Sequence, residues 1–214
     1  MQITLNDVSY SYPGSTQTVL DGVRAVFPVG WTGIIGNNGC GKSTLARIAT
    51  GMLAPDSGTV SPRGLVVAYC EQDATIPPDR LEDFACSWEQ TAVRLRVDLG
   101  VDDDWPWRYD MLSSGQQKRL QVAVALWENP DVLVMDEPTN HVDVLTRRAI
   151  LRALAGYRGV GLLISHDREL LDALAGQCLC FEGARVVMRP GGYTQAGEQA
   201  ACDTKTAQRQ RRDA

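Results

Sequence analysis

The stretch GIIGNNGCGKST, residues 33–44, decides the fold of this 214-residue chain. It contains the spacing G-x-x-x-x-G-K-S from Gly36 to Ser43, directly after a buried-strand pattern and before a helical pattern. Glycines are needed here because successive backbone N–H groups must wrap a phosphate group, while the helix N-terminus adds its positive end. The pattern therefore predicts a phosphate-binding loop, or P-loop, formed by Gly36, Asn37, Asn38, Gly39, Cys40, Gly41, Lys42, Ser43 and Thr44.

The residues at the end of the P-loop and a second motif predict what the site does with the phosphates. Lys42 is placed to reach the β- and γ-phosphates of a nucleotide, and Ser43 to ligate Mg²⁺. The segment VLVMDEP, residues 132–138, is typical of a buried strand that ends in two carboxylates. Asp136 can hold the Mg²⁺ shell, and Glu137 can polarise a water aimed at the γ-phosphate. An acidic turn is as good an interpretation in isolation, but the P-loop in the same chain favours catalysis.

The composition excludes several classes of protein. Hydrophobic residues make up 44% of the chain and charged residues 22%, which is typical of a folded globular domain. The net charge of -5 argues against a domain that binds nucleic acid over its whole surface. The apolar runs are far shorter than the roughly 20 residues of a membrane span, and the start lacks a secretory signal pattern. We therefore expect a cytoplasmic protein.

The hydropathy pattern changes along the chain. Residues 3–12 alternate apolar and polar positions with a change of parity near Asn6 and Asp7, and Val19 to Phe27 follows as a second strand. These two strands are expected to be antiparallel, because the segment between them is too short for a crossover helix. Later apolar runs do not alternate, as expected of parallel strands buried on both faces. These runs are WTGII, LVVAY, VLVMD and VGLLI.

Helical patterns separate these runs, which predicts an α/β fold with an antiparallel edge. The last stretch, residues 195–214, loses apolar residues and predicts a polar, basic helix or linker. Its basic residues are Lys205, Arg209, Arg211 and Arg212. Helices are expected after Gly41, over Leu81 to Leu99, Ser114 to Trp127, Val144 to Ala155, and Asp167 to Ala175.

Several further motifs resemble those of one family. LSSGQ, residues 112–116, followed by QKRLQVAVAL and VLVMDEPTNHVD, is similar to the signature, Walker B and D-loop series of ATP-binding-cassette (ABC) ATPases. Tyr12, Gln72 in VAYCEQ and His166 in LLISHDREL occur in that family's order and spacing. The resemblance implies a RecA-like P-loop NTPase core with an N-terminal antiparallel β subdomain and a small α-helical subdomain. It implies an ABC domain over residues 1–194, followed by the segment 195–214.

Within that superfamily the chain resembles the ABC-F group, whose soluble members contain paired cassettes and act on ribosomes. The motifs that carry this resemblance are EPTNHVD, SHDREL and GGYT, residues 191–194. Carried over by position, the resemblance implies that Tyr12 stacks on adenine, although Tyr10 on the same strand is an alternative. It makes Glu137 the catalytic base and His166 the γ-phosphate contact, with Gln72 in the Mg²⁺ and water shell. The implied metal ligands are Ser43, Gln72 and Asp136.

The signature implies that a single cassette is incomplete. In the family this motif binds the γ-phosphate of the ATP held by the opposite cassette, so two cassettes must meet head to tail. Here it consists of Ser113, Ser114, Gly115 and Gln116, and Asp143 is the D-loop residue. Ser114 replaces the usual glycine and is a candidate helix cap. Cys40 lies beside a helix N-terminus, so we expect its thiol to have a lowered pKa.

Two functions remain open at this point. The first is one half of an ABC-F-like factor that acts on the ribosome and its rRNA, in translation or antibiotic resistance. The second is the nucleotide-binding subunit of a membrane transporter, with a coupling helix docked near Gln72. Since 39 residues separate Gln72 from Leu112, we expect a small helical lobe and no large arm. A non-enzymatic scaffold is the least favoured alternative, because Lys42, Glu137 and His166 are all present.

Overall fold

The computed structural model describes residues 1–212 except 141 and 184, and for residues 204–212 it describes the backbone course alone. His141 of the TNHVD motif and the basic side chains after residue 203 therefore lie outside the described part. The strands are β1 (Gln2–Ser11), β2 (Thr18–Pro28), β3 (Gly30–Ile35), β4 (Ser57–Ser61), β5 (Val67–Cys70), β6 (Val132–Asp136), β7 (Val160–Ile164), β8 (Ala175–Glu182) and β9 (Arg185–Pro190). The helices are α1 (Lys42–Ala49), α2 (Leu81–Cys86), α3 (Gln90–Leu99), the 3-10 helix η1 (Trp105–Met111), α4 (Ser114–Trp127), α5 (Val144–Ala155), α6 (Arg168–Leu174) and α7 (Tyr193–Arg212).

The main sheet confirms the predicted α/β core. Within the described residues it has the order β5-β6-β7-β3-β8-β9, with parallel pairing from β5 to β8 and antiparallel pairing of β8 with β9. Every residue of β6 and β7 is buried, as the non-alternating runs predict. Leu133 and Met135 pack under the helices of one face, whereas Val132 and Val134 pack toward α1 and the β lobe. Alternate side chains of β6 thus pack into two hydrophobic cores, one on each face of the sheet.

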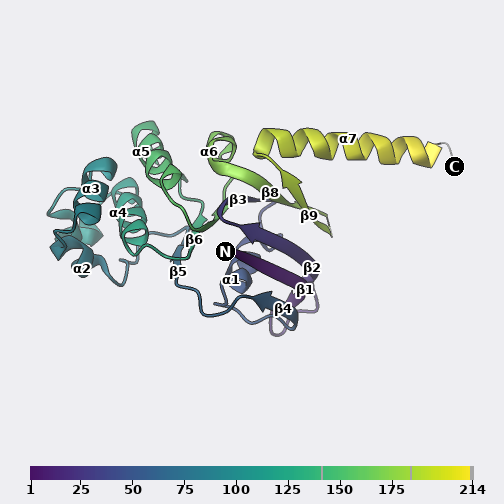
Figure 1. Ribbon diagram of the computed structural model, residues 1–214, viewed down its shortest axis with the longest axis horizontal. Helices are drawn as coiled ribbons and strands as arrows, with labels where there is room; N and C mark the ends of the chain where they lie inside the picture. The colour runs from purple at the N-terminus through teal and green to yellow at the C-terminus, as the bar shows by residue number, and fades with distance from the viewer. Residues whose placement is uncertain (141, 184, 213–214) are drawn as a thin grey trace.

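The N-terminal β lobe is an antiparallel sheet in the order β2-β1-β4. The register of β1 shifts between Leu5 and Val8, and Asp7 has a φ of 49°, which confirms the predicted irregularity near Asn6 and Asp7. Strand β4 was not predicted, because SGTVS is short and mostly exposed. The lobe packs on α1, which places the β1–β2 hairpin beside the P-loop (Figure 1).

The prediction of one helix over Leu81 to Leu99 is wrong. Helix α2 ends at Cys86 and α3 begins at Gln90, with Ser87 in an extended conformation between them. The guanidinium of Arg96 donates to the carbonyl oxygens of Phe84 and Ser87, both at 2.9 Å. A buried side chain therefore satisfies carbonyls that a continuous helix would have bonded itself. With η1 and α4 these helices form a small lobe at one end of the molecule, as expected (Figure 1).

The C-terminal helix begins earlier than expected, at Tyr193 in the GGYT segment. Its first turn is fixed because the backbone N–H and hydroxyl of Thr194 donate to the carboxylate of Asp172, at 2.8 and 2.6 Å. Ala196 is buried against β8, Asp203 pairs with Arg189 of β9 at 2.8 Å, and beyond these contacts α7 extends away from the core (Figure 1). The division at residue 194 stays a prediction. Among the described residues, we find no helix that combines the length and the apolar character required to cross a membrane.

Candidate nucleotide-binding site

The P-loop connects β3 to α1 in a backbone form that only glycine accepts readily. Gly39 and Gly41 have φ values of 78° and 106°. A Cβ added to Gly41 would lie 2.7 Å from Cγ1 of Val19, so the β1–β2 hairpin closes the space beside it. No side chain caps the N-terminus of α1. The first N–H groups of α1 are therefore available to an anion, as a phosphate site requires.

Lys42 is held in place by hydrogen bonds within the loop. Its Nζ donates to the carbonyl oxygens of Gly36 and Asn37, both at 2.9 Å, and the residue is 8% exposed. These bonds place a cation across the curve of the loop. A phosphate bound to the loop amides would meet this ammonium without a large movement of the side chain.

The end of β6 supplies two carboxylates in different environments. Asp136 is buried and its Oδ2 accepts a hydrogen bond of 3.2 Å from the hydroxyl of Tyr69. Glu137 follows with a φ of 49°, an uncommon value for a residue with a side chain, and this turns its carboxylate toward β7. Burial raises the pKa of the Glu137 carboxyl, although the N–H of His166 opposes this rise. A carboxylate with a raised pKa in a cleft is suited to take a proton from water.

His166 connects this carboxylate to the P-loop. Its backbone N–H donates to Oε2 of Glu137 at 3.3 Å, and its Nε2 lies 3.6 Å from Oε1. The same Nε2 lies 3.0 Å from Oδ1 of Asn38. Three segments that follow β3, β6 and β7 thus meet at the carboxyl edge of the sheet, where parallel sheets commonly bind ligands.

A cavity of about 500 Å³ lies where these segments meet, and its volume suits a nucleotide. Tyr12 is 45% exposed beside it, and its hydroxyl shares a 2.8 Å hydrogen bond with Oγ1 of Thr44. Tyr10 is buried in the β lobe, so Tyr12 is the tyrosine that faces the cavity. The cavity is lined by Tyr12, Ser15, Gln17, Val19, Asn38, Gly39, Gly41, Lys42, Ser43, Thr44, Gln72, Asp136, Glu137 and Ile164.

The expected metal ligands are brought together at this cavity. Ser43, Gln72 and Asp136 all line it and offer hydroxyl, amide and carboxylate oxygens. This set fits Mg²⁺, which prefers oxygen donors and is commonly shared with substrate phosphates. When bound, the ion would neutralise charge on the phosphate groups.

The signature residues lie apart from this cavity. Ser113 is the N-cap of α4, because its Oγ accepts from the N–H of Gln116 at 3.4 Å while Oε1 of Gln116 accepts from the N–H of Ser113 at 2.9 Å. The expectation that Ser114 is the cap is wrong, since Ser114 is already the first helical residue. Gly115 lies in the same exposed first turn, where a second nucleotide could reach the helix N-terminus.

Asp143 caps the helix that follows the D-loop. Its carboxylate accepts from the N–H and the hydroxyl of Thr146, at 2.9 and 2.8 Å. These hydrogen bonds lower the pKa of the Asp143 carboxyl. The residue therefore has a structural role in this chain, and its contact with an opposite cassette stays a prediction.

The expectation that the Cys40 thiol has a lowered pKa is wrong. Burial raises the pKa of this thiol more than Lys42 and the loop amides lower it. The sulfur packs under the loop, because a Cβ on Gly36 would meet Sγ of Cys40 and Cβ of Phe181, both at 2.7 Å. An apolar neighbourhood therefore outweighs the helix N-terminus at this position.

Two residues of the site were missed from the sequence. Tyr69 donates to Asp136, and Lys118 donates to the carbonyl oxygens of Glu71 and Gln72. Both lie in stretches that carry the family resemblance, VAYCEQ and QKRLQVAVAL, but neither residue has a role that the sequence alone indicates. Their roles follow from the neighbouring positions of β5, β6 and α4, which the chain brings together from three separate segments.

The fold and this cavity define a P-loop nucleotide-binding domain. A protein-family model described as "ABC transporter" matches residues 25–140, and the chain therefore belongs to that family of ATPases. A solved structure described as the ATP binding subunit of an ABC transporter superposes with a TM-score of 0.72 at 21% identity, over 89% of this chain and 90% of that chain. This likeness shows the fold.

Curated relatives refine the subgroup. The chain is 34% identical over 209 residues to the ATP-binding protein Uup of Escherichia coli, covering 91% of this chain and 33% of the relative. It is 33% identical to the ribosome protection protein VmlR of Bacillus subtilis, over 90% and 33% of the two chains. It is 32% identical to the energy-dependent translational throttle protein EttA of Haemophilus influenzae, over 92% and 38%. These relatives confirm the ABC-F resemblance, and the chain spans about a third of their length.

Proposed function

We propose that this chain is a cassette that binds and hydrolyses MgATP when two cassettes meet head to tail. One observation carries the proposal. The P-loop, Asp136 and Glu137 line one cavity, and His166 contacts two of its lining residues, Asn38 and Glu137, whereas the helix N-terminus at Ser113 is exposed outside it. A site with its phosphate-binding half in one place and its signature half in another is completed by a second copy or a second cassette.

We assign a separate role to each residue of the proposed site. Tyr12 offers its exposed ring to adenine, while the loop amides and Lys42 bind the phosphates. Glu137 accepts a proton from the attacking water on its carboxylate, and His166 orients that carboxylate through its backbone N–H. The hydroxyl of Ser113 and the N–H groups of Ser114 and Gly115 donate to the γ-phosphate held by the opposite cassette, since the N–H of Ser113 is already bonded to Gln116.

We further propose that the chain acts in the cytoplasm on the ribosome as one half of an ABC-F-type factor. The names of two relatives, a ribosome protection protein and a translational throttle protein, support this partner. The segment 205–212 contains Lys205, Arg209, Arg211 and Arg212, which could meet rRNA phosphates that the acidic body of the domain would repel.

Sedimentation of a cell extract tests the ribosomal partner. Glu137→Gln removes the proton acceptor but leaves the P-loop intact, so ATP should hold the full-length protein on ribosomes. The matched control is the double variant Glu137→Gln with Lys42→Ala, which should not bind ATP and should remain at the top of a sucrose gradient. Equal sedimentation of the two variants in the presence of ATP would contradict the proposal.

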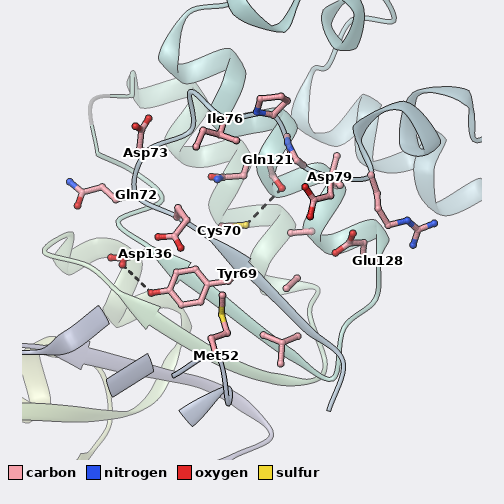
Figure 2. Close-up of a pocket in the computed structure, with 18 of the residues that line it drawn as sticks. Met52, Tyr69, Cys70, Gln72, Asp73, Ile76, Asp79, Gln121, Glu128 and Asp136 are labelled. Atoms are coloured by element: carbon pink, nitrogen blue, oxygen red, sulfur yellow. Dashed lines mark hydrogen bonds between the residues drawn. The ribbon is translucent and has the colours of Figure 1, made fainter. Parts of the chain in front are cut away.

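A second candidate is the ATP-binding subunit of a membrane transporter. The observation that favours it is a groove of about 870 Å³ between α1 and the helical lobe, beside Gln72 (Figure 2). Its walls combine apolar residues such as Met52 and Ile76 with the carboxylates of Asp79 and Glu128. A short helix of a membrane subunit could dock there. Recovery of the Glu137→Gln variant with membranes, and its absence from ribosomal fractions, would favour this candidate.

A further inference from the structure

Lys118 is a buried lysine on α4, the helix that begins at the signature. It is 3% exposed, and its Nζ donates to the carbonyl oxygens of Glu71 at 2.7 Å and Gln72 at 3.1 Å. Its third hydrogen bond goes to Oε1 of Gln121 at 2.8 Å. We propose that Lys118 is a positioning residue that fixes the backbone at Gln72 for hydrolysis and connects it to the signature helix.

The free-energy cost of burying a charge indicates that Lys118 does more than fill space in the core. Burying an ammonium costs several kcal/mol unless its donors are satisfied, and an apolar residue would fill the same volume without that cost. All three donors of Lys118 have acceptors, and all three acceptors are neutral oxygens. Burial lowers the pKa of the Lys118 ammonium. A buried cation that is fully bonded to backbone carbonyls fixes the orientation of those peptide groups.

The peptide groups that it fixes lead directly into the nucleotide cavity. Gln72 lines both the cavity of about 500 Å³ and the larger groove, two residues after β5 ends at Cys70. The core holds the same segment from its other side. Arg47 pairs with the carboxylate of Glu71 at 3.0 Å, and Tyr69 donates to Asp136 (Figure 2). Lys118 is one of the contacts that the helical lobe makes with this segment, together with the hydroxyl of Tyr109, which donates to the carbonyl oxygen of Ala74 at 2.6 Å.

Because Lys118 lies on α4, its contact with the Gln72 segment also connects that segment to the signature. Ser113 caps the N-terminus of the same helix, so a shift of the Gln72 segment and a shift of the signature are coupled through one rigid element. This inference rests on the proposed hydrolysis by paired cassettes. It adds that Lys118 links two parts of one cassette: the Gln72 segment of its own nucleotide site, and the signature that contacts the nucleotide of the opposite cassette.

Steady-state ATP hydrolysis by the full chain provides the first test. Lys118→Met should lower kcat about tenfold or more while the KM for ATP changes less than about threefold, because the phosphate-binding residues are untouched. Lys118→Arg should retain at least about half of kcat, since a guanidinium can donate to the same carbonyls and a neighbouring cavity of about 340 Å³ gives it room.

Arg119 offers a matched control on the next position of the helix. Its guanidinium also donates to two backbone carbonyls, those of Leu99 and Gly100 at 3.1 and 3.0 Å, but these lie in the helical lobe away from Gln72. Arg119→Met should therefore keep the kcat of the wild type. A wild-type kcat in Lys118→Met, or an equal loss in Arg119→Met, would overturn the inference. A wild-type chain without hydrolysis would contradict the proposed function, and the second test then decides this inference alone.

Labelling of buried cysteines with iodoacetamide provides that second test without nucleotide. Cys70 is 1% exposed and adjoins Glu71, whereas Cys178 is 0% exposed in β8 and reports on the whole fold. Lys118→Met should raise the ratio of the Cys70 rate to the Cys178 rate about tenfold, and Arg119→Met should not. Loss of the cation by itself disfavours the Cys70 thiolate, so faster labelling reports opening of this segment. Parallel acceleration of both cysteines, or none, would overturn the inference.

Discussion

Replacement of Lys42 by alanine tests the assignment of the nucleotide cavity. The ammonium bonds the carbonyl oxygens of Gly36 and Asn37, and no side chain caps the N-terminus of α1 beside it. On binding, the ammonium would exchange these neutral acceptors for charged phosphate oxygens. Hydrogen bonds between charged groups contribute about 1.5–3 kcal/mol each, and Lys42 can reach two phosphates. Since the bonds to the carbonyls are partly lost, we expect a net loss of about 3 kcal/mol, or on the order of 100-fold in Kd.

Isothermal titration with MgATP measures this loss. The control is Arg24→Ala, which removes an exposed cation that pairs with Asp7 in the β lobe and does not line the cavity. Its Kd should stay within about twofold of the wild type, because long-range effects of an exposed charge are screened. A Kd for Lys42→Ala within about threefold of the wild type would refute the reasoning, and so would an equal loss in Arg24→Ala.

Three further predictions concern the remaining groups of the site. Burial raises the pKa of Glu137, and protonation removes the base, so the rate of hydrolysis should fall with decreasing pH at a midpoint above the ordinary value of 4.5, as a pH profile of kcat can show. Ser113→Ala should lower the free energy of unfolding by about 1 kcal/mol through loss of the N-cap, while Ser114→Ala should change it little, as measured by urea unfolding. Maleimide should label Cys40 more slowly than the exposed Cys86 in peptide mapping, because its thiol is packed under the loop; faster labelling of Cys40 would contradict that packing.

The sequence predicted the parts of the molecule whose residues act within one short segment. The P-loop, the buried parallel strands and the irregularity of β1 all follow from local spacing and periodicity. The break between α2 and α3 could not be predicted in this way, because the carbonyls at the end of α2 are bonded by Arg96 from the following helix. The helical spacing of apolar residues can continue through a break in the helix itself, because a later side chain supplies the hydrogen bonds that the backbone carbonyls at the break lack.

The same distinction applies to the candidate site. The motif residues Lys42, Asp136 and Glu137 converge as the spacing of strand and helix implies. The pKa of Cys40 was predicted with the wrong sign, because the helix N-terminus is local, whereas the burial that raises the pKa depends on how the folded chain surrounds the loop, including Phe181 of β8, which crowds the Cβ position of Gly36 together with the Cys40 sulfur. Lys118 was missed for the same reason, since its acceptors lie in a segment 46 and 47 residues away.

Mixing of two inactive variants tests the head-to-tail pairing most directly. Lys42→Ala destroys the phosphate-binding half of a site, and Ser113→Arg blocks the signature half, so each variant alone should lack ATP hydrolysis. In a mixed pair, the intact P-loop of one chain meets the intact signature of the other. With random pairing about half of the pairs are mixed and each has one of two sites intact, so the mixture should recover about a quarter of the wild-type rate. A mixture that remains as inactive as its two components, beside an active wild type, would contradict the pairing.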